Sequence, residues 1–219
     1  MAFPAILYAT SASQALPVVA AVAVWGRRPP APYPWIVSWC VVLIASDALD
    51  LVVAYVSGPN LWLAYFTLPI ELSLTLLLLA AWQSSAGFRT AYRLAVPVTI
   101  AGHVALLLLT ERAVIFEIWV IPFSGLIALA GILHTLVHRS LLSRGILTDQ
   151  DWFWVLLGMA LFWATFVPVP AFAQAVLAPR IDWAQSAYIV RSWIKIAAFL
   201  LITWGILCQR HQTPSPGRS

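Results

Sequence analysis

The sequence predicts an all-α membrane protein, a bundle of seven transmembrane helices, and three observations support this prediction. First, 62% of the residues are hydrophobic and only 9% are charged, whereas a soluble domain has about 45–50% apolar and about 25% charged residues. Second, the apolar runs approach the roughly 20 residues that a helix needs to cross a bilayer. Third, the sequence lacks the alternating segments, about ten residues long, that are typical of membrane barrels.

Each expected helix is an apolar run bounded by clusters of proline, glycine or arginine. The connections are short, so we expect one transmembrane domain over residues 1–208 and a disordered cytoplasmic tail over 209–219. The expected spans are 4–25, 34–56, 61–82, 91–110, 115–138, 152–177 and 185–208.

The first span resembles a signal peptide in its apolar composition. It lacks basic residues ahead of the apolar run, however, and Arg27 and Arg28 follow the run instead. We therefore expect a retained helix. Its polar stripe consists of Thr10, Ser13, Gln14 and Pro17.

The second and third spans carry carboxylates where apolar residues are expected. Asp47 and Asp50 are three residues apart, so they share one face of the second span. Glu71 lies near the middle of the third span, and Thr67 and Thr75 stand four residues to either side of it. This spacing predicts a polar stripe on one helix face.

The fourth and fifth spans each offer one further candidate. His103 lies in the outer half of the fourth span, and Glu117 lies at the outer end of the fifth. The alternative for His103 is a hydrogen-bonded packing residue, since a lone histidine shows no metal-ligand spacing.

The sixth span contains the segment FVPVPAF, which places Pro168 and Pro170 in its outer half. Proline removes a helix hydrogen bond and its ring meets the carbonyl one turn earlier, so we expect a kink or a break there. A broken helix is tolerated in a membrane where its freed carbonyls line a cavity. Gln174 adds an amide to the same half of the span.

The seventh span contains VRSWIKIAAFLL, which holds two cations. Arg191 and Lys195 are four residues apart and therefore share a helix face. Lys195 is the only lysine in the chain. An ammonium group loses its proton or forms a covalent bond far more readily than a guanidinium, so its place near mid-membrane predicts a specific role.

Arginine placement predicts the orientation. The connections after the first, third and fifth spans and the segment after the seventh carry most of the arginines, which puts the N-terminus outside and the C-terminus in the cytoplasm. These arginines are Arg27, Arg28, Arg89, Arg93, Arg139, Arg144, Arg210 and Arg218.

With this orientation, the charges of the spans lie at mid-membrane or towards the outside. A charge at mid-membrane costs about 2.5–3.5 kcal/mol on insertion scales, so intramembrane charges are candidates for function. We expect an outward-facing pocket that binds or transports a small polar solute, with no catalytic residue, metal or nucleic-acid partner. Its main residues are Asp47, Asp50, Glu71, Arg191 and Lys195, and its secondary residues are Thr67, His103, Gln14, Gln174 and Glu117.

Two alternatives use the same residues differently. The charges can form a purely structural ion network that holds the helices together. The chain can also be a sensor or an accessory subunit without its own output domain, acting through a membrane-complex partner or as a homo-oligomer. Membrane lipids are a partner in every case.

The third and seventh spans suggest an internal repeat. The segment AYFTLPIELSLTLLLLAAW parallels AYIVRSWIKIAAFLLITW, and this alignment sets Glu71 opposite Lys195. It predicts a 3+1+3 arrangement with parallel repeats, as in some transporters.

Lys195 on the last span also resembles the retinal-binding lysine of microbial rhodopsins. WLAYFTLPIELSL in the third span and FWATFVP in the sixth are similar to segments of that family. The resemblance implies retinal bound to Lys195 as an alternative to a protein without a cofactor. Arg191 stands where that family carries an aspartate.

Two further resemblances concern the second and third spans. DALDLVVAYVSGPNLWLAYFTLPIE resembles a pattern in small, uncharacterised bacterial seven-helix proteins, which implies a multi-pass protein of the inner (plasma) membrane and no known activity. LDLVVAYVSGPN is similar to the end of the second helix in KDEL-receptor and sugar-transporter-like proteins, which implies a transporter fold.

Overall fold

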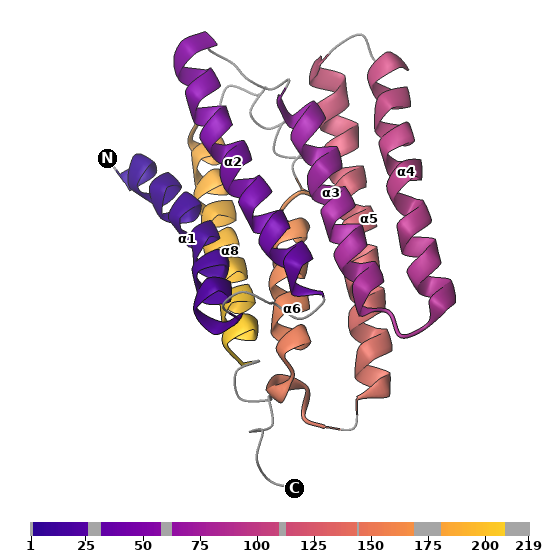
Figure 1. Ribbon diagram of the computed structural model, residues 1–219. Helices are drawn as coiled ribbons and strands as arrows, with labels where there is room; N and C mark the ends of the chain where they lie inside the picture. Colours follow the sequence, from indigo (N-terminus) through magenta and orange to yellow (C-terminus); the bar gives the residue numbers. More distant parts are fainter. Residues whose placement is uncertain are drawn as a thin grey trace, which may run out of the picture.

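The computed structural model describes residues 2–25, 32–57, 63–109, 113–143, 145–168 and 181–208, and these residues form seven α-helices and a short 3₁₀ helix, η2 (Leu147–Asp149) (Figure 1). The predicted all-α fold is confirmed. The α-helices are α1 (Ala2–Trp25), α2 (Tyr33–Ser57), α3 (Ala64–Trp82), α4 (Ala86–Leu109), α5 (Ala113–Leu142), α6 (Asp151–Ala164) and α8 (Ile181–Cys208).

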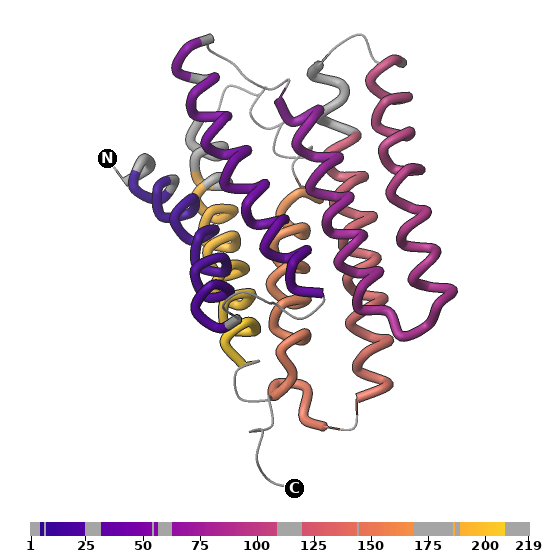
Figure 2. The backbone as a smooth tube through the Cα atoms, in the orientation of Figure 1, coloured from indigo at the N-terminus to yellow at the C-terminus, as the bar shows by residue number. Residues whose placement is uncertain are grey.

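The helices form two layers that are closed at both edges. Helices α2 and α3 pack side by side in one layer, and α5, α6 and α8 form the other (Figure 1). Helix α1 closes one edge by packing on α2 and α8, and α4 closes the other by packing on α3 and α5. Successive helices run in opposite directions, as the tube in Figure 2 shows, so connections between neighbours stay short.

Five of the helices are long and apolar enough to cross a membrane: α2, α3, α4, α5 and α8. The chain is therefore a helical membrane protein. Helices α1 and α6 have shorter apolar segments, Tyr8–Val24 and Asp151–Ala164. The N-outside orientation and the 3+1+3 repeat stay predictions, and the tail over 209–219 lies outside the described residues.

The predicted extent of the sixth span, 152–177, is wrong for the helix itself, because α6 ends at Ala164 and a turn follows to Pro168. The predicted effect of proline accounts for this end. Pro168 lacks an N–H to bond the carbonyl of Ala164, and its ring would crowd that carbonyl. The amides of Thr165 and Phe166 instead bond the carbonyls of Phe162 and Trp163 in tighter turns. Residues 169–180 lie outside the described part.

The other predicted boundaries differ by a few residues. Helix α4 begins at Ala86 instead of residue 91, α5 extends to Leu142 instead of 138, and α8 begins at Ile181 instead of 185. Each observed helix includes polar residues from the expected connection. Hydropathy alone ends a predicted span at the first polar residues, whereas helical backbone continues into the membrane interface.

The core lies between the two layers and is aromatic. The Trp39 ring of α2 meets Phe162 of α6 edge to face at 4.9 Å and lies 6.1 Å from Phe199 of α8, and all three side chains are fully buried. Helices α6 and α8 approach closely at Gly158, where an added Cβ would lie only 2.5 Å from the carbonyl oxygen of Ala198. Small residues permit such close helix contacts in membranes. This contact fixes α6 against the helix that carries Lys195.

Candidate functional site

The five main candidate residues gather around Glu71 and Lys195, and we call them the charged cluster: Asp47, Asp50, Glu71, Arg191 and Lys195. Glu71 interacts with the other four charges, and so does Lys195. Helix α2 supplies two of the carboxylates, α3 supplies Glu71, and α8 supplies both cations. The cluster therefore joins the two layers, with carboxylates from one and cations from the other.

Glu71 is the most deeply placed carboxylate, with 6% of its surface exposed. Thr75 lies one turn further along α3 and is fully buried. The Thr75 hydroxyl donates to the Glu71 carbonyl oxygen at 2.9 Å and accepts a hydrogen bond from the Trp163 indole at 3.2 Å. Helix α6 is thereby tied to α3 next to the carboxylate. Thr67, one turn before Glu71, is half-buried on the same stripe.

Asp47 is held by helix α1. Its Oδ2 accepts a hydrogen bond from Gln14 Nε2 at 2.6 Å and one from Ser11 Oγ at 3.3 Å. Gln14 is fully buried, and its Oε1 has no hydrogen-bond partner in the described part of the chain. Hydrogen bonds that an amide N–H donates to a carboxylate are short and strong. The structure thus brings the secondary candidate Gln14 to the cluster.

Ser11 was missed by the sequence reasoning. Its spacing of three residues from Gln14 puts both on one helix face, and this was the available signal. The predicted stripe residues Thr10 and Ser13 instead bond carbonyl oxygens of their own helix, those of Ile6 and Thr10.

Two phenylalanines line the cation side of the cluster. Lys195 Nζ lies 5.3 Å from the Phe162 ring centroid and 6.0 Å from that of Phe166, and Arg191 Cζ lies 5.0 Å from Phe166. Cations within about 6 Å of a ring face are attracted by its quadrupole. Both rings were missed as site residues, although their four-residue spacing on the sixth span predicts one shared face.

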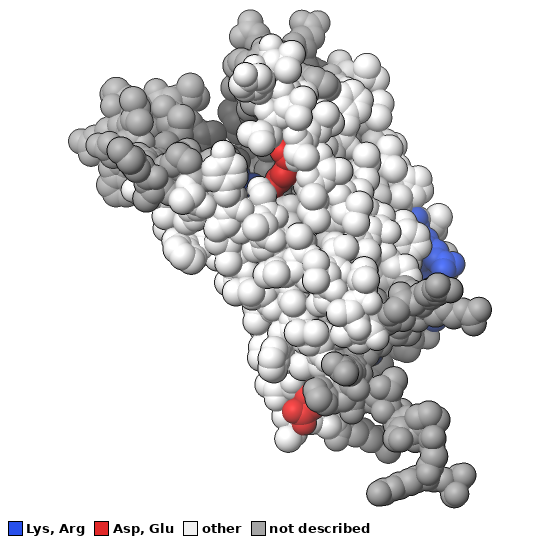
Figure 3. All heavy atoms as spheres, turned by 60° about the vertical axis from the view of Figure 1, so that its left-hand side comes forward, with Lys and Arg blue, Asp and Glu red and all other residues white. Residues whose placement is uncertain are grey.

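The cluster extends from the surface to the interior. Asp50 is exposed, Asp47, Arg191 and Lys195 are half-buried, and Glu71 is buried. Figure 3 shows acidic atoms at the surface in the upper half of the molecule, with basic atoms just visible beside them. A polar group can therefore reach the outer carboxylates from this side.

Of the remaining secondary candidates, the structure describes the side chain of His103 alone. His103 is buried between α4 and α5, where its Nδ1 donates to the Thr99 carbonyl oxygen at 2.7 Å and its Nε2 lies 3.0 Å from Ser124 Oγ. This geometry fits the packing alternative for that residue. The Glu117 side chain and the whole of Gln174 lie outside the described residues.

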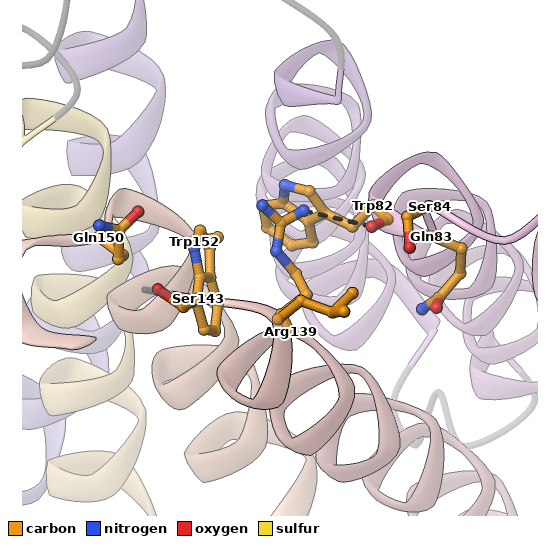
Figure 4. A pocket seen from close by; sticks show the side chains of 8 residues that line it. Trp82, Gln83, Ser84, Arg139, Ser143, Gln150 and Trp152 are labelled. Atoms are coloured by element: carbon orange, nitrogen blue, oxygen red, sulfur yellow. Dashed lines mark hydrogen bonds between the residues drawn. The ribbon is translucent and has the colours of Figure 1, made fainter. Parts of the chain in front are cut away.

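A second polar region lies at the opposite end of the bundle. A cavity of about 330 Å³ opens where α3 and α5 end and α6 begins. Figure 4 shows Arg139 pointing across it, with a hydrogen bond to the Trp82 carbonyl. From the sequence, Arg139 was expected only to help set the orientation of the helices in the membrane.

Comparison of the chain with family models, with curated proteins and with solved structures finds no match. The resemblances to bacterial seven-helix proteins, to KDEL-receptor and sugar-transporter-like proteins and to microbial rhodopsins therefore stay predictions.

Proposed function

We propose that this membrane protein binds a small zwitterionic solute at the charged cluster and carries it across the bilayer. The observation that carries the proposal is the composition of the cluster. Three carboxylates face two cations, and the five groups come from α2, α3 and α8. Such a site offers separate partners for an ammonium group and a carboxylate group on one molecule.

The charge count favours a ligand over a structural network alone. Within the cluster, the carboxylates outnumber the cations by one. Asp50 is exposed, so a proton or a cationic group that balances the surplus charge can reach the cluster at this residue. The ammonium end of a zwitterion supplies that charge, and its carboxylate end is matched to Arg191.

The graded exposure gives the solute a route. Asp50 is exposed and Glu71 is buried, so a cationic group can move from the outer carboxylates towards the inner one. The early end of α6 at Ala164 sets Phe166 on a turn beside both cations. A turn can shift with less loss of hydrogen bonds than a continuous helix, as alternating access requires.

The test uses the purified protein in proteoliposomes and radiolabelled alanine, glutamate and lysine as zwitterionic, anionic and cationic probes. We expect alanine uptake that is abolished by Asp47→Asn together with Glu71→Gln. The matched control is Asp149→Asn, which removes an exposed carboxylate outside the cluster and should leave uptake unchanged. Absence of binding and uptake for all three probes, or equal uptake by the double variant, would refute the proposal.

Binding without uptake would instead support the sensor or accessory-subunit reading. The two outcomes are separated by measuring equilibrium binding of alanine in detergent beside uptake in vesicles. A sensor should bind alanine, and Asp47→Asn together with Glu71→Gln should abolish this binding. Vesicles that contain the sensor should accumulate no alanine.

Lys195 supports a second candidate function, covalent binding of retinal. Its Nζ, on the last helix, lies 5.3 Å and 6.0 Å from the rings of Phe162 and Phe166 of the sixth span, with the Glu71 and Asp47 carboxylates in electrostatic reach. Carboxylates stabilise a protonated Schiff base, whereas the nearby Arg191 opposes one. Expression with all-trans-retinal should then give a visible absorption band that Lys195→Arg abolishes. A colourless wild-type protein excludes this candidate.

A further inference from the structure

The cavity at the ends of α3 and α5 is separate from the charged cluster. Trp82 lies eleven residues beyond Glu71 on α3, which is about 16 Å along the helix axis at about 1.5 Å per residue. The cavity measures about 330 Å³, at the lower end of the roughly 300–1,000 Å³ that is usual for small-molecule sites. Its position at the helix ends puts it at the membrane interface.

Among the described residues that line the cavity, Arg139 is the one cation. Its guanidinium stacks on Trp152, with Cζ 5.0 Å from the ring centroid. Its Nη1 donates a hydrogen bond to the Trp82 carbonyl oxygen at 3.2 Å. Its Nε is buried and has no hydrogen-bond partner within the described residues. A guanidinium carries five N–H donors in a rigid fork, so this one is positioned but not saturated.

The rest of the described lining is uncharged, with four polar residues beside Leu142 and two tryptophans. Ser84, Ser143, Gln83 and Gln150 supply hydroxyl and amide groups, and the described lining contains no carboxylate. Gln83 is 2% exposed; its Nε2 donates to Thr135 at 2.8 Å, while its Oε1 has no hydrogen-bond partner in the described part. A buried amide end without a partner is costly. An acceptor is therefore left over for a ligand that also carries a hydrogen-bond donor.

Asp151 does not form a hydrogen-bonded ion pair with Arg139 among the described contacts. Its carboxylate accepts the hydrogen bond of the Tyr33 hydroxyl, and it interacts with Arg139 only through the field of its charge. This interaction helps to hold the guanidinium in place. The Ser84 hydroxyl lies 3.4 Å from His138 Nε2, so Arg139 and Ser143 are the donors of this lining that an anion would use.

We propose that this cavity binds a phosphate ester whose alcohol carries a hydroxyl or an ammonium group. The phosphate would accept hydrogen bonds from Arg139 and Ser143, and the donor of the alcohol would meet Gln83. Two sources share this chemistry, a phospholipid headgroup such as phosphoglycerol and a soluble phosphate ester. Basic pockets between helices at the membrane interface are typical sites for anionic headgroups, and the neighbouring Leu141 and Leu142 are 79% and 60% exposed, as acyl-chain contacts require.

The test measures thermal stability of the full chain in a neutral detergent. The probes are short-chain phosphatidylglycerol, short-chain phosphatidylcholine and glycerol 3-phosphate. Wild-type protein should be stabilised by phosphatidylglycerol, by glycerol 3-phosphate, or by both, and much less by phosphatidylcholine, whose headgroup has no donor. Stabilisation by the lipid alone assigns the site to a headgroup, and stabilisation by glycerol 3-phosphate at similar concentrations assigns it to a soluble ester.

Two variants and one control complete the design. Arg139→Gln and the cavity-filling Ser143→Leu should each weaken the apparent affinity by about tenfold or more, because they remove the charge-assisted bonds or the space. Arg93→Gln removes an exposed arginine near the same end of the bundle and should leave the affinity unchanged. Equal stabilisation by all three probes, or wild-type affinity in Ser143→Leu, would overturn the proposal; Ser143→Leu decides the matter if Arg139→Gln does not fold.

Discussion

The charged cluster and the Arg139 cavity share helix α3 and are built from opposite inventories. The cluster brings together charges of both signs, three carboxylates and two cations, and stacks the cations on phenylalanine rings. The cavity sets one guanidinium on a tryptophan ring among neutral amides and hydroxyls. The first arrangement suits a ligand with both charges, and the second suits an anion with a donor. The two proposed sites therefore separate two ligand chemistries along the axis of the bundle.

The largest expected effect comes from removing Lys195, one of the two cations of the cluster. Lys195→Met leaves three carboxylates with one guanidinium, so we expect the free energy of unfolding to fall by about 2–3 kcal/mol, no more than the low end for losing one partner of a buried ion pair, because Lys195 is half-buried. Reversible unfolding in mixed detergent micelles measures this loss. Phosphate-ester binding at the cavity should stay unchanged.

A double-mutant cycle sharpens the same prediction. Adding Glu71→Gln to Lys195→Met should recover about 1–2 kcal/mol, because the charge that Lys195 balanced is then gone. Lys195→Arg serves as the control that keeps the charge. Strictly additive losses would mean that the two residues do not interact, and the view of the cluster as one unit would be wrong.

A smaller effect is expected at the packing that supports both regions. Gly158→Ala places a Cβ 2.5 Å from the Ala198 carbonyl oxygen, so α6 must move from α8, at a cost of about 2 kcal/mol. Because α6 carries Phe162 at the cluster and Trp152 at the cavity, alanine uptake and phosphate-ester binding should both decline.

Gly102→Ala is the matched control for this packing change. In the described part of the chain, a Cβ added there would meet no side chain and no other helix within 4 Å, and alanine favours a helix over glycine by up to about 1 kcal/mol. The control should therefore be as stable as the wild type or more stable. Equal behaviour of the two alanine variants in thermal unfolding would rule out the close α6–α8 contact.

A change on α1 should affect the cluster alone. Gln14→Leu removes the donor to Asp47 and should cost about 1.5 kcal/mol, as for a hydrogen bond to a charged group. Ser13→Ala is the control, since that hydroxyl bonds only its own helix and such bonds contribute little. Unfolding in mixed micelles compares the two. A loss in Ser13→Ala as large as that in Gln14→Leu would contradict the assignment.

The smallest effect concerns the tie between α3 and α6. Trp163→Phe removes the indole donor to Thr75 and should lower the free energy of unfolding by about 1 kcal/mol, with a similar ring retained in the core. Trp193→Phe, at a side chain that is 61% exposed, should be neutral in the same unfolding assay. If both variants have the same free energy of unfolding, the hydrogen bond between Trp163 and Thr75 does not stabilise the contact of α6 with α3.

The sequence by itself determined the class of fold, the approximate helices and the residues of the charged cluster. Hydropathy has this power because a bilayer requires long apolar helices and makes every charge within them conspicuous. Helical spacing further predicted that Asp47 and Asp50 share a face and that Arg191 and Lys195 share another. The effect of Pro168 on the sixth span also followed from local chemistry, although the last helical residue, Ala164, did not.

The tertiary structure alone decided which faces meet. Helix rotation is set by packing between helices, such as the close contact at Gly158, and no local pattern encodes it. Packing therefore brought Ser11 to Asp47 and the two phenylalanines to the cations. It also joined the ends of α3 and α5 to the start of α6 around Arg139. That cavity depends on three segments distant in sequence, so their ordinary interfacial residues became a site only when the bundle assembled.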